Sequence, residues 1–383
     1  MEWKEVRLGD VCTRVCSGGT PKSTNLSYYG GEIPWLNTKE IDFNRIYSTE
    51  KTITDSGLNN SSAKWIVPNT ITVAMYGATA GKSCIVKVPM TTNQACCNLA
   101  INDKVADYEF VYYSLKNDYT TLASLANGGA QQNLNAQIIK DYVLKMPSLA
   151  DQRRIASILS SLDRKIELNN KINADLEEMA QAIFKNWFVD FEPFKDGKFV
   201  DSELGMIPEG WKVGTLGELC NFKRGKNLLT KNAIDEGVPV VAGGLEPSCY
   251  HNVANTGAPV ITVSGSGANA GFMRMYHVPV WASDCSFIDI SCENFYFVYC
   301  FLKVNSKLLK HAQTGAVQPH VKPSDIHDFE LVIPDKESIY EFQDKVKPFF
   351  DKIALIQKEN SRLSLLRDTL LPRLMSGELE VPE

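Results

Sequence analysis

The amino-acid sequence contains one pattern twice, and this duplication restricts the possible folds more than any other feature. The stretch WKEVRLGDVC at 3–12 recurs as WKVGTLGELC at 211–220, and ITVAMYGATAGKS at 71–83 recurs as ITVSGSGANAGFM at 261–273. Two further pairs follow in the same order: YEFVYYSLK at 108–116 with FYFVYCFLK at 295–303, and GAQQNLNAQIIKDYVLKMP at 129–147 with GAVQPHVKPSDIHDFELVIP at 315–334. Four matches in one order indicate a tandem duplication, so we expect two similar globular halves.

The distance between matching segments falls along the chain. It is 208 residues for the first pair, 190 for the second and 187 for the third. The first copy must therefore carry longer loops, and most of the extra residues lie before residue 70.

The segment MYGATAGKSCIV at 75–86 carries a lysine and a serine after two glycines, as a nucleotide-binding P-loop does. A P-loop requires four residues between its first glycine and the Gly-Lys-Ser end, and a helix follows it. Here three residues separate Gly77 from Gly81, and the flanks TITVAMY and SCIVKVPM are both typical of strands. The second copy has phenylalanine and methionine at 272–273. We therefore predict a β-hairpin whose glycines permit a tight turn and close approach to a ligand.

Composition indicates an ordinary globular protein. The chain has 383 residues, of which 44% are hydrophobic and 22% charged, enough for two or more domains. No apolar run approaches the roughly 18 residues of a membrane helix, and the charged start MEWKEVRLGD differs from a secretory signal. The ten cysteines show no Cys-x-x-Cys spacing. We expect a cytoplasmic protein with reduced thiols and no membrane partner.

A segment without glycine or proline, 148–188, follows the first copy. Ser148 and Asp151 are typical of a capping box, and the apolar residues that follow recur with heptad spacing. The second copy repeats this spacing after a shift of 187 residues, and Pro348 predicts a break or kink there. Each helix could pack only on its own domain, but two equivalent helices favour pairing with each other. The residues expected to pair them are Leu162, Ile166, Asn173, Leu176, Ile183, Phe349, Ile353, Asn360, Leu363 and Leu370.

These features predict an α+β fold. It consists of two tandem domains of mixed α/β structure joined by two long helices, which form an antiparallel coiled coil with pseudo-two-fold symmetry. The expected boundaries are 1–147 for the first domain, 148–188 for the first long helix, 189–208 for a linker, 209–334 for the second domain and 335–376 for the second long helix.

No catalytic constellation is recognisable in the sequence. All five histidines lie in the second copy, without the spacing of metal ligands, and there is no Asn-Pro-Pro-aromatic motif for base methylation. We expect no catalytic residues, no metal and no cofactor. A non-catalytic tandem-repeat scaffold or ligand-binding protein would show the same duplication and is the alternative to a DNA-binding function.

The motifs resemble the specificity (S) subunits of type I restriction-modification enzymes. The resemblance is carried by the Trp-Lys and Leu-Gly-acid opening of each copy, by YGATAGK, by TTNQA at 91–95 and by GAQQNLN at 129–135. The segment ADQRRIASILSSLDRKIELNNKINADLEEMAQAIFKNWFVDFEPF and the tail LRDTLLPRLMSGEL extend it over essentially the whole chain. The second hairpin departs from the pattern because it lacks the basic residue of the first.

The resemblance implies that each globular half is a target recognition domain, which binds one half of a split, asymmetric site in double-stranded DNA. It also implies that the long helices set the gap between the half-sites and dock two modification (M) subunits, which carry the S-adenosylmethionine chemistry. Restriction (R) subunits would add ATP-driven translocation and cleavage. The chain itself would then bind DNA and partners without catalysis. Its net charge of −5 is compatible with this if the M subunits supply much of the phosphate contact.

The candidate DNA-binding residues are polar side chains near the loops that both copies share. Glutamine and asparagine can recognise adenine and arginine can recognise guanine in the major groove. In the first half the candidates are Lys22, Tyr76, Lys82, Gln131, Gln132 and Asn133, and in the second half they are Arg224, Lys226, Arg274, Gln318, His320 and Lys322.

Asn173 and Asn360 occupy the same position in the two helical repeats, because 187 residues separate them. In an antiparallel pair, positions near the middle face each other. We therefore predict that the two amides lie close together and fix the register of the helices.

Overall fold

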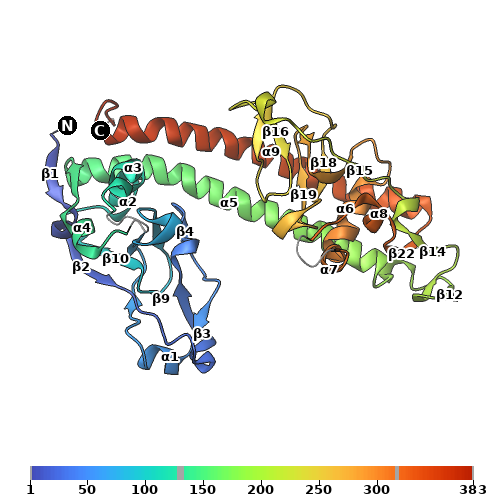
Figure 1. Ribbon diagram of the computed structural model, residues 1–383, viewed down its shortest axis with the longest axis horizontal. Helices are drawn as coiled ribbons and strands as arrows, with labels where there is room; N and C mark the ends of the chain where they lie inside the picture. The colour runs from blue at the N-terminus through green and yellow to red at the C-terminus, as the bar shows by residue number, and fades with distance from the viewer. Residues whose placement is uncertain (1, 127–132, 315–318, 382–383) are drawn as a thin grey trace. The chain divides into compact units, whose positions relative to one another are not determined.

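A computed structural model describes residues 2–126, 133–314 and 319–381, and Figure 1 shows its elements. The chain forms two compact units, one made of Met1–Glu167 with Asn360–Glu383 and the other of Leu168–Glu359. Both long helices, α5 (Leu149–Phe188) and α9 (Lys336–Met375), contribute one stretch to each unit. Each unit combines sheets with short helices and these two stretches, so the predicted α+β class is confirmed.

The first unit is built on a five-stranded sheet of order β2-β10-β7-β8-β4. Apolar side chains of this sheet belong to two clusters. One cluster packs against helices, and the other is smaller and includes Leu36, Cys84 and Met90. The strands are β2 (Cys12–Ser17), β4 (Arg45–Ile46), β7 (Ile71–Ala74), β8 (Ser83–Val86) and β10 (Cys96–Ile101).

The extra residues of the first copy form most of a second, four-stranded sheet of order β5-β3-β9-β6. Ile33, Trp35, Ile53 and Ala63 form its own small core. Its elements are β3 (Tyr29–Leu36), β5 (Thr52–Ile53), α1 (Asp55–Asn59), β6 (Trp65–Ile66) and β9 (Met90–Thr92).

Helix α2 (Tyr108–Asn117) is the central helix of the first unit and lies beside the first part of α5 in Figure 1. Asp107 caps it by accepting a hydrogen bond from the Phe110 N–H at 3.0 Å, and seven of its residues are buried. Phe110, Ile155 and Leu374 belong to one core cluster, so α2, α5 and α9 share this core. The remaining elements are β1 (Lys4–Arg7), α3 (Tyr119–Ser124), α4 (Ala136–Asp141) and β11 (Val143–Met146).

The second unit repeats this plan with a four-stranded main sheet in place of the five-stranded one. Its main sheet has the order β15-β21-β18-β19, beside a three-stranded sheet of order β17-β16-β20 and the pair β14-β22. The strands are β14 (Lys212–Thr215), β15 (Lys223–Arg224), β16 (Val238–Val241), β17 (Cys249–His251), β18 (Val260–Ser264), β19 (Met273–Tyr276), β20 (Trp281–Ala282), β21 (Cys285–Asp289) and β22 (Glu330–Ile333).

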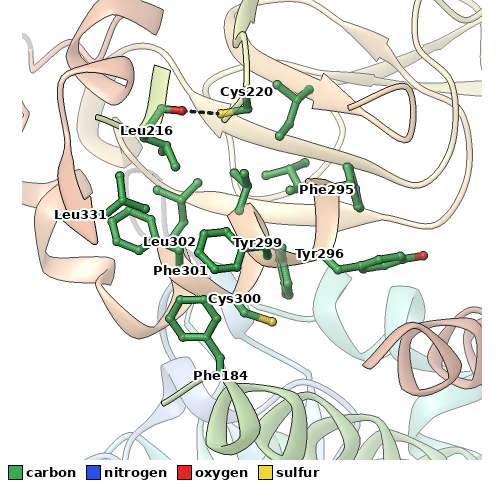
Figure 2. Close-up of a cluster of buried hydrophobic side chains, with 14 of the residues drawn as sticks. Phe184, Leu216, Cys220, Phe295, Tyr296, Tyr299, Cys300, Phe301, Leu302 and Leu331 are labelled. Carbon is green, nitrogen blue, oxygen red and sulfur yellow. Dashed lines mark hydrogen bonds between the residues drawn. The ribbon is translucent and has the colours of Figure 1, made fainter. Parts of the chain in front are cut away.

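The core of the second unit is rich in aromatic side chains. Helix α6 (Phe295–Val304) stands where α2 stands in the first unit, and eight of its residues are buried. Figure 2 shows part of this cluster, in which Phe184 from α5 lies with Phe301 and Leu331. The helices that complete the repeat are α7 (Ser306–His311) and α8 (Pro323–His327).

The duplication is confirmed, because matching segments form matching elements. In the first unit the Leu8 N–H donates to the carbonyl of Tyr142 at 2.8 Å, and in the second the Leu216 N–H donates to the carbonyl of Phe329 at 2.9 Å. Each bond joins the Leu-Gly-acid motif to the first residue after α4 or the second residue after α8.

Each long helix has a side-chain hydrogen bond that caps its first turn. The Ser148 hydroxyl accepts the Asp151 N–H at 3.2 Å, and the Asp335 carboxylate accepts the Ser338 N–H at 2.8 Å. Helical structure continues through Pro348, so the expected break is not present. A proline inside a helix removes one N–H donor and places its ring against the carbonyl of the preceding turn. A bend at this proline stays a prediction.

The two helices run antiparallel within each unit. In the first unit Asp163 of α5 pairs with Arg367 of α9 at 2.7 Å, while Ile155 clusters with Leu374. In the second, Asn169 donates to Glu359 at 2.9 Å. Farther along, Phe184 packs on Phe342 with ring centroids 5.7 Å apart. Residue numbers rise along one helix as they fall along the other.

The segment between the copies is ordered in part. Strands β12 (Phe199–Ser202) and β13 (Gly205–Pro208) form a hairpin, and Phe191 and Phe194 pack their rings on Trp211. Across residues 2–126, 133–314 and 319–381, no helix has the length and apolar character needed to cross a membrane.

Candidate nucleic-acid interface

The first glycine hairpin, residues 71–86, joins β7 to β8. The strands pair antiparallel with Ile71 opposite Ile85 and Val73 opposite Ser83. Gly77 and Gly81 have φ values of +79° and +85°, in the left-handed region that favours glycine. The Gly81 N–H donates to the carbonyl of Ala74 at 2.9 Å and closes the turn. A strand follows the turn where a P-loop would have a helix, so the hairpin prediction is confirmed.

The second glycine hairpin, residues 260–276, joins β18 to β19 with the same geometry. Gly267 and Gly271 have φ values of +79° and +77°. The Gly271 N–H donates to the carbonyl of Ser264 at 2.9 Å, as Gly81 does to Ala74 in the first hairpin. The lysine of the first hairpin is therefore not needed for this turn, since Phe272 occupies its position.

The two glycines of each hairpin have different surroundings. A Cβ atom at Gly77 or Gly267 would meet nothing within 4 Å, so these residues form an open tip. A Cβ atom at Gly81 would lie 3.2 Å from Ala123, and one at Gly271 would lie 2.6 Å from the carbonyl oxygen of Leu309. The second glycine thus lets the hairpin pack against α3 or α7, while the first presents backbone to the surface.

A second loop borders each hairpin tip. The Leu134 N–H donates to the carbonyl of Met75 at 2.9 Å, and the Val321 N–H donates to the carbonyl of Gly265 at 3.1 Å. These donors end the GAQQNL segment and its counterpart in the second copy. The candidates Tyr76 and Asn133 are each next in sequence to a residue of this hydrogen bond, so the structure places both candidates at one site.

Lys82 is the cation of the first hairpin, and it is already paired. Its ammonium group lies 2.5 Å from the Asp42 carboxylate, and 27% of its side chain is exposed. Asp42 lies in the loop before β4, in the part of the first copy that the second copy lacks. The pair holds the ammonium group beside the hairpin tip.

Arg224, on β15, is a cation beside the second hairpin. Its guanidinium forms an ion pair with Asp284, and the Ser266 hydroxyl donates to the same carboxylate. A Cβ atom at Gly265 would lie 2.2 Å from this guanidinium, so the glycine provides the space that the arginine occupies.

Arg274, on β19, is held by two acceptors. Its guanidinium donates to the carbonyl of Leu245 and to the carboxylate of Glu246, both at 3.0 Å. It also lies over the ring of Tyr276 at 5.1 Å from the centroid, and burial raises the pKa of that phenol. Arg274 therefore projects in one fixed direction.

Within the part of the chain that the structure describes, no three His, Cys, Asp or Glu side chains are grouped so that they could hold a metal ion. All ten cysteines are free thiols, and burial raises the pKa of Cys285 beside the second hairpin to about 12. This thiol is protonated at neutral pH and is not a nucleophile.

Comparison with known proteins identifies the family. The family model described as "Type I restriction modification DNA specificity domain" matches residues 1–178 and 208–365. The chain belongs to this specificity-subunit family. The type I restriction enzyme MjaIX specificity subunit of Methanocaldococcus jannaschii is 31% identical over 411 residues, which cover 100% of this chain and 94% of that protein.

Other specificity subunits are similar over their full length. The type I restriction enzyme HindI specificity subunit of Haemophilus influenzae is 24% identical, over 99% of this chain and 100% of that protein. The crystal structure of the S subunit of a type I restriction-modification system from M. genitalium superposes with a TM-score of 0.58. It covers 98% of this chain and 96% of that chain at 21% identity, which supports the fold.

The remaining candidates for a specificity subunit's DNA contacts are distributed around the hairpins. Lys22, Lys226 and Lys322 are exposed. His320 is half-buried in a short bridge, where its N–H donates to the carbonyl of Thr314 at 2.8 Å. Gln131, Gln132 and Gln318 lie outside the described residues.

Sequence analysis missed the carboxylates that hold the candidate cations. They are Asp42, Glu246 and Asp284, which lie 40, 28 and 60 residues from the side chains they pair with. No short motif links such partners, and two of the three lie in loops that differ between the copies. Only the topology of the specificity-subunit fold brings them together.

Five of the ten candidate helix-pairing residues pack in hydrophobic cores, and pairing of the helices through the whole set stays a prediction. Leu176, Ile183, Phe349 and Ile353 pack in the core of the second unit, and Leu370 packs in that of the first. Leu162, Ile166 and Leu363 are half-buried. Asn173 and Asn360 belong to different units, so their proximity stays a prediction.

Proposed function

We propose that this chain is the DNA sequence-recognition subunit of a type I restriction-modification enzyme. The observation that carries the proposal is the repeated glycine hairpin, which presents an open backbone tip beside a fixed arginine or lysine in each unit. Membership of the specificity-subunit family makes DNA the ligand that fits two such sites. A tandem-repeat scaffold would not require positioned cations at both tips.

Each unit would bind one half of a bipartite, asymmetric site. The guanidinium groups of Arg224 and Arg274 can donate two hydrogen bonds to guanine, and the amide of Asn133 can pair with adenine. The exposed lysines Lys22, Lys226 and Lys322 suit phosphate contacts, which position a protein without specifying sequence. Because the side chains at the two tips differ, the two half-sites would differ in sequence.

The chain would act without catalysis of its own. Two M subunits would dock on the long helices and transfer the methyl group, and R subunits would add translocation and cleavage. The resemblance to specificity subunits supports these partners, the absence of a cofactor requirement in this chain and a cytoplasmic location. The acidic net charge of −5 fits a subunit that binds DNA together with its partners.

The test is to co-express the chain with the methyltransferase subunit encoded beside it and to map the methylated bases. We expect methylation at one split sequence. Alanine substitutions at Gln131, Gln132 and Asn133 should change the preference in one half-site, and matched substitutions at Gln318 and His320 should change the other. If either set of substitutions reduced methylation equally at both half-sites, the two units could not be independent recognition units. DNA binding without sequence preference by the whole complex would favour the scaffold alternative.

A further inference from the structure

A buried cluster of charges holds the first unit together, and the described residues of the second unit form no such cluster at the equivalent place. At its centre is Arg45 of β4, whose side chain is 3% exposed. The carboxylates of Glu109 and Asp163 beside it are 8% and 9% exposed. A buried charge is tolerated only when it is paired, so these groups depend on one another.

Arg45 contacts two helices. One nitrogen of its guanidinium lies 3.0 Å from Glu167 and 3.7 Å from Asp163, both on α5. The other lies 3.4 Å from Glu109 and 3.3 Å from the Tyr113 hydroxyl, both on α2. The planar guanidinium therefore joins β4 to α2 and α5 at once.

Further contacts extend the cluster to α9. The Tyr113 hydroxyl donates to Asp163 at 2.5 Å, and Arg367 of α9 donates to the other oxygen of Asp163 at 2.7 Å. Arg164 pairs with Glu109 at 2.9 Å. Three arginines thus balance three carboxylates. Burial, and then the Asp163 carboxylate, raise the pKa of Tyr113, so its hydroxyl stays protonated as a donor.

The second unit has uncharged residues at most of the equivalent positions, although Arg164 corresponds to Asp351. With the shift of 187 residues, Glu109 corresponds to Tyr296 and Asp163 to Phe350. Their rings stack with centroids 5.1 Å apart and an interplanar angle of 11°. Ala180 stands where the first unit has Arg367, and Cys300 where it has Tyr113. One ion pair, between Lys303 and Glu177 at 2.8 Å, lies at the edge of this contact.

The strand that carries Arg45 belongs to the residues that only the first copy has. β4 pairs in parallel with β8, with Arg45 opposite Ile85. Among the described strands of the second unit, none pairs with β19 at the place of β4. β8 is the second strand of the first glycine hairpin, so Arg45 is one strand away from the candidate DNA contacts.

We propose that Arg45 is a positioning residue, which fixes the first glycine hairpin on α5 and α9 by charge, whereas packing of Tyr296 and Phe350 fixes the second. The proposal rests on the proposed function for its consequence in DNA recognition. An arginine that contacts Glu109, Asp163 and Glu167 together sets both the distance and the angle of the sheet relative to the helices. Without these contacts of Arg45, the sheet could move relative to the helices. The first half-site could then be bound at more than one distance from the second.

The first experiment needs no DNA. Hydrogen exchange is measured on the full chain and on Arg45→Met, which keeps the length of the side chain and removes its charge. We expect faster exchange at amides of β8 and of residues 159–167, by about tenfold or more, a factor that corresponds to about 1.4 kcal/mol. The amides of β19 in the second unit should be unchanged. Phe350→Leu is the matched control and should change the second unit instead.

The second experiment uses the complex with the methyltransferase subunit and DNA sites whose spacer is native, one base pair longer or one base pair shorter. Arg45→Met should lower the ratio of methylation at the native spacer to that at the altered spacers by about tenfold. Arg45→Lys keeps the positive charge but lacks the planar guanidinium. Its methylation ratio should lie between those of Arg45→Met and the natural protein. A uniform fall in rate with an unchanged ratio would show a merely structural role and overturn the proposal.

The two experiments separate this proposal from the proposed function. If the natural complex methylates no specific sequence, the proposed function fails. Hydrogen exchange alone then decides whether Arg45 positions the first glycine hairpin on the helices. Unchanged exchange at β8 in both Arg45 variants would overturn the proposal even if methylation is specific. Should Arg45→Met fail to fold, the Arg45→Lys comparison supplies the same two readouts.

Discussion

The ammonium group of Lys82 lies 2.5 Å from the carboxylate of Asp42, so the basic side chain at the first glycine hairpin is neutralised before any DNA arrives. The second hairpin repeats this relationship with Arg224 and Asp284. Phosphate attraction provides most of the non-specific affinity of DNA-binding proteins. Pairing each cation with a carboxylate lowers its attraction to phosphate. If these cations contact DNA, hydrogen bonds to base edges then contribute a larger share of the total affinity.

Asp42→Asn is therefore expected to strengthen binding to DNA without a recognition site. A freed lysine adds about one phosphate contact, which steepens the dependence of log K on log salt by about 0.9. The measurement is a titration of the methyltransferase complex with labelled non-specific duplex at several salt concentrations. Asp103→Asn removes the same charge from an exposed loop away from the hairpin and is the control. Equal slopes for the two variants would contradict the expectation.

Sequence analysis predicted the parts of the fold that depend on local or repeated patterns. The glycine hairpins and the cap at Ser148 follow from residue types within one turn of the chain. The heptad faces of α5 and α9 follow from apolar spacing. The partners of Lys82 and Arg45 could not be predicted in this way, because they are brought together by the sheet order of the first unit. At Pro348 helix α9 continues without a break, and a bend at this residue stays a prediction.

Gly267 and Gly271 provide a matched test of the second hairpin. Both have positive φ, so alanine at either position costs about 1–2 kcal/mol of conformational strain. At Gly271 the new Cβ would also lie 2.6 Å from the Leu309 carbonyl oxygen, whereas at Gly267 it meets nothing within 4 Å. Gly271→Ala should thus reduce the free energy of unfolding by about 1–3 kcal/mol more than Gly267→Ala. Urea unfolding of each variant measures this, and equal losses would contradict the packing role of Gly271.

Asp335 should make the start of α9 sensitive to acid. Burial opposes its charge, but hydrogen bonds from the Ser338 N–H and hydroxyl and from the Trp211 indole lower the pKa of the carboxyl overall. A lowered pKa in the folded state gives stability that is present at neutral pH and lost as the pH falls through that pKa. Asp335→Ala should cost about 1 kcal/mol at pH 7 and less near pH 3.

Asp335→Asn separates the charge from the cap. Asparagine keeps an acceptor for the Ser338 N–H, so this variant should retain most of the stability at pH 7 while losing the acid-dependent part. Thermal unfolding between pH 3 and pH 7 gives both quantities. A difference between Asp335→Ala and the natural protein that is the same at both ends of this range would rule out the titration of Asp335 as its cause.

Two asparagines on the inner face of α5 should respond to the same substitution in opposite ways. Asn169 is 1% exposed, and its amide donates to the Glu359 carboxylate of α9 at 2.9 Å. The side-chain oxygen of Asn173, one turn later, is also buried, but no group among the described residues donates a hydrogen bond to it. An unsatisfied buried acceptor lowers stability, whereas a satisfied one fixes the position of its partner.

Asn173→Leu should therefore raise the free energy of unfolding by about 1 kcal/mol, because an apolar side chain fits this face without an unpaired oxygen. Asn169→Leu should lower it by about 1–3 kcal/mol, because Glu359 loses a donor in a partly buried site. Since a paired polar residue in such a seam holds the register of helices, Asn169→Leu should also relax the spacer length that the methyltransferase complex accepts. Urea unfolding and methylation of spacer variants measure the two effects. Destabilisation by both substitutions would show that the Asn173 oxygen is satisfied in solution and would remove the basis for this prediction.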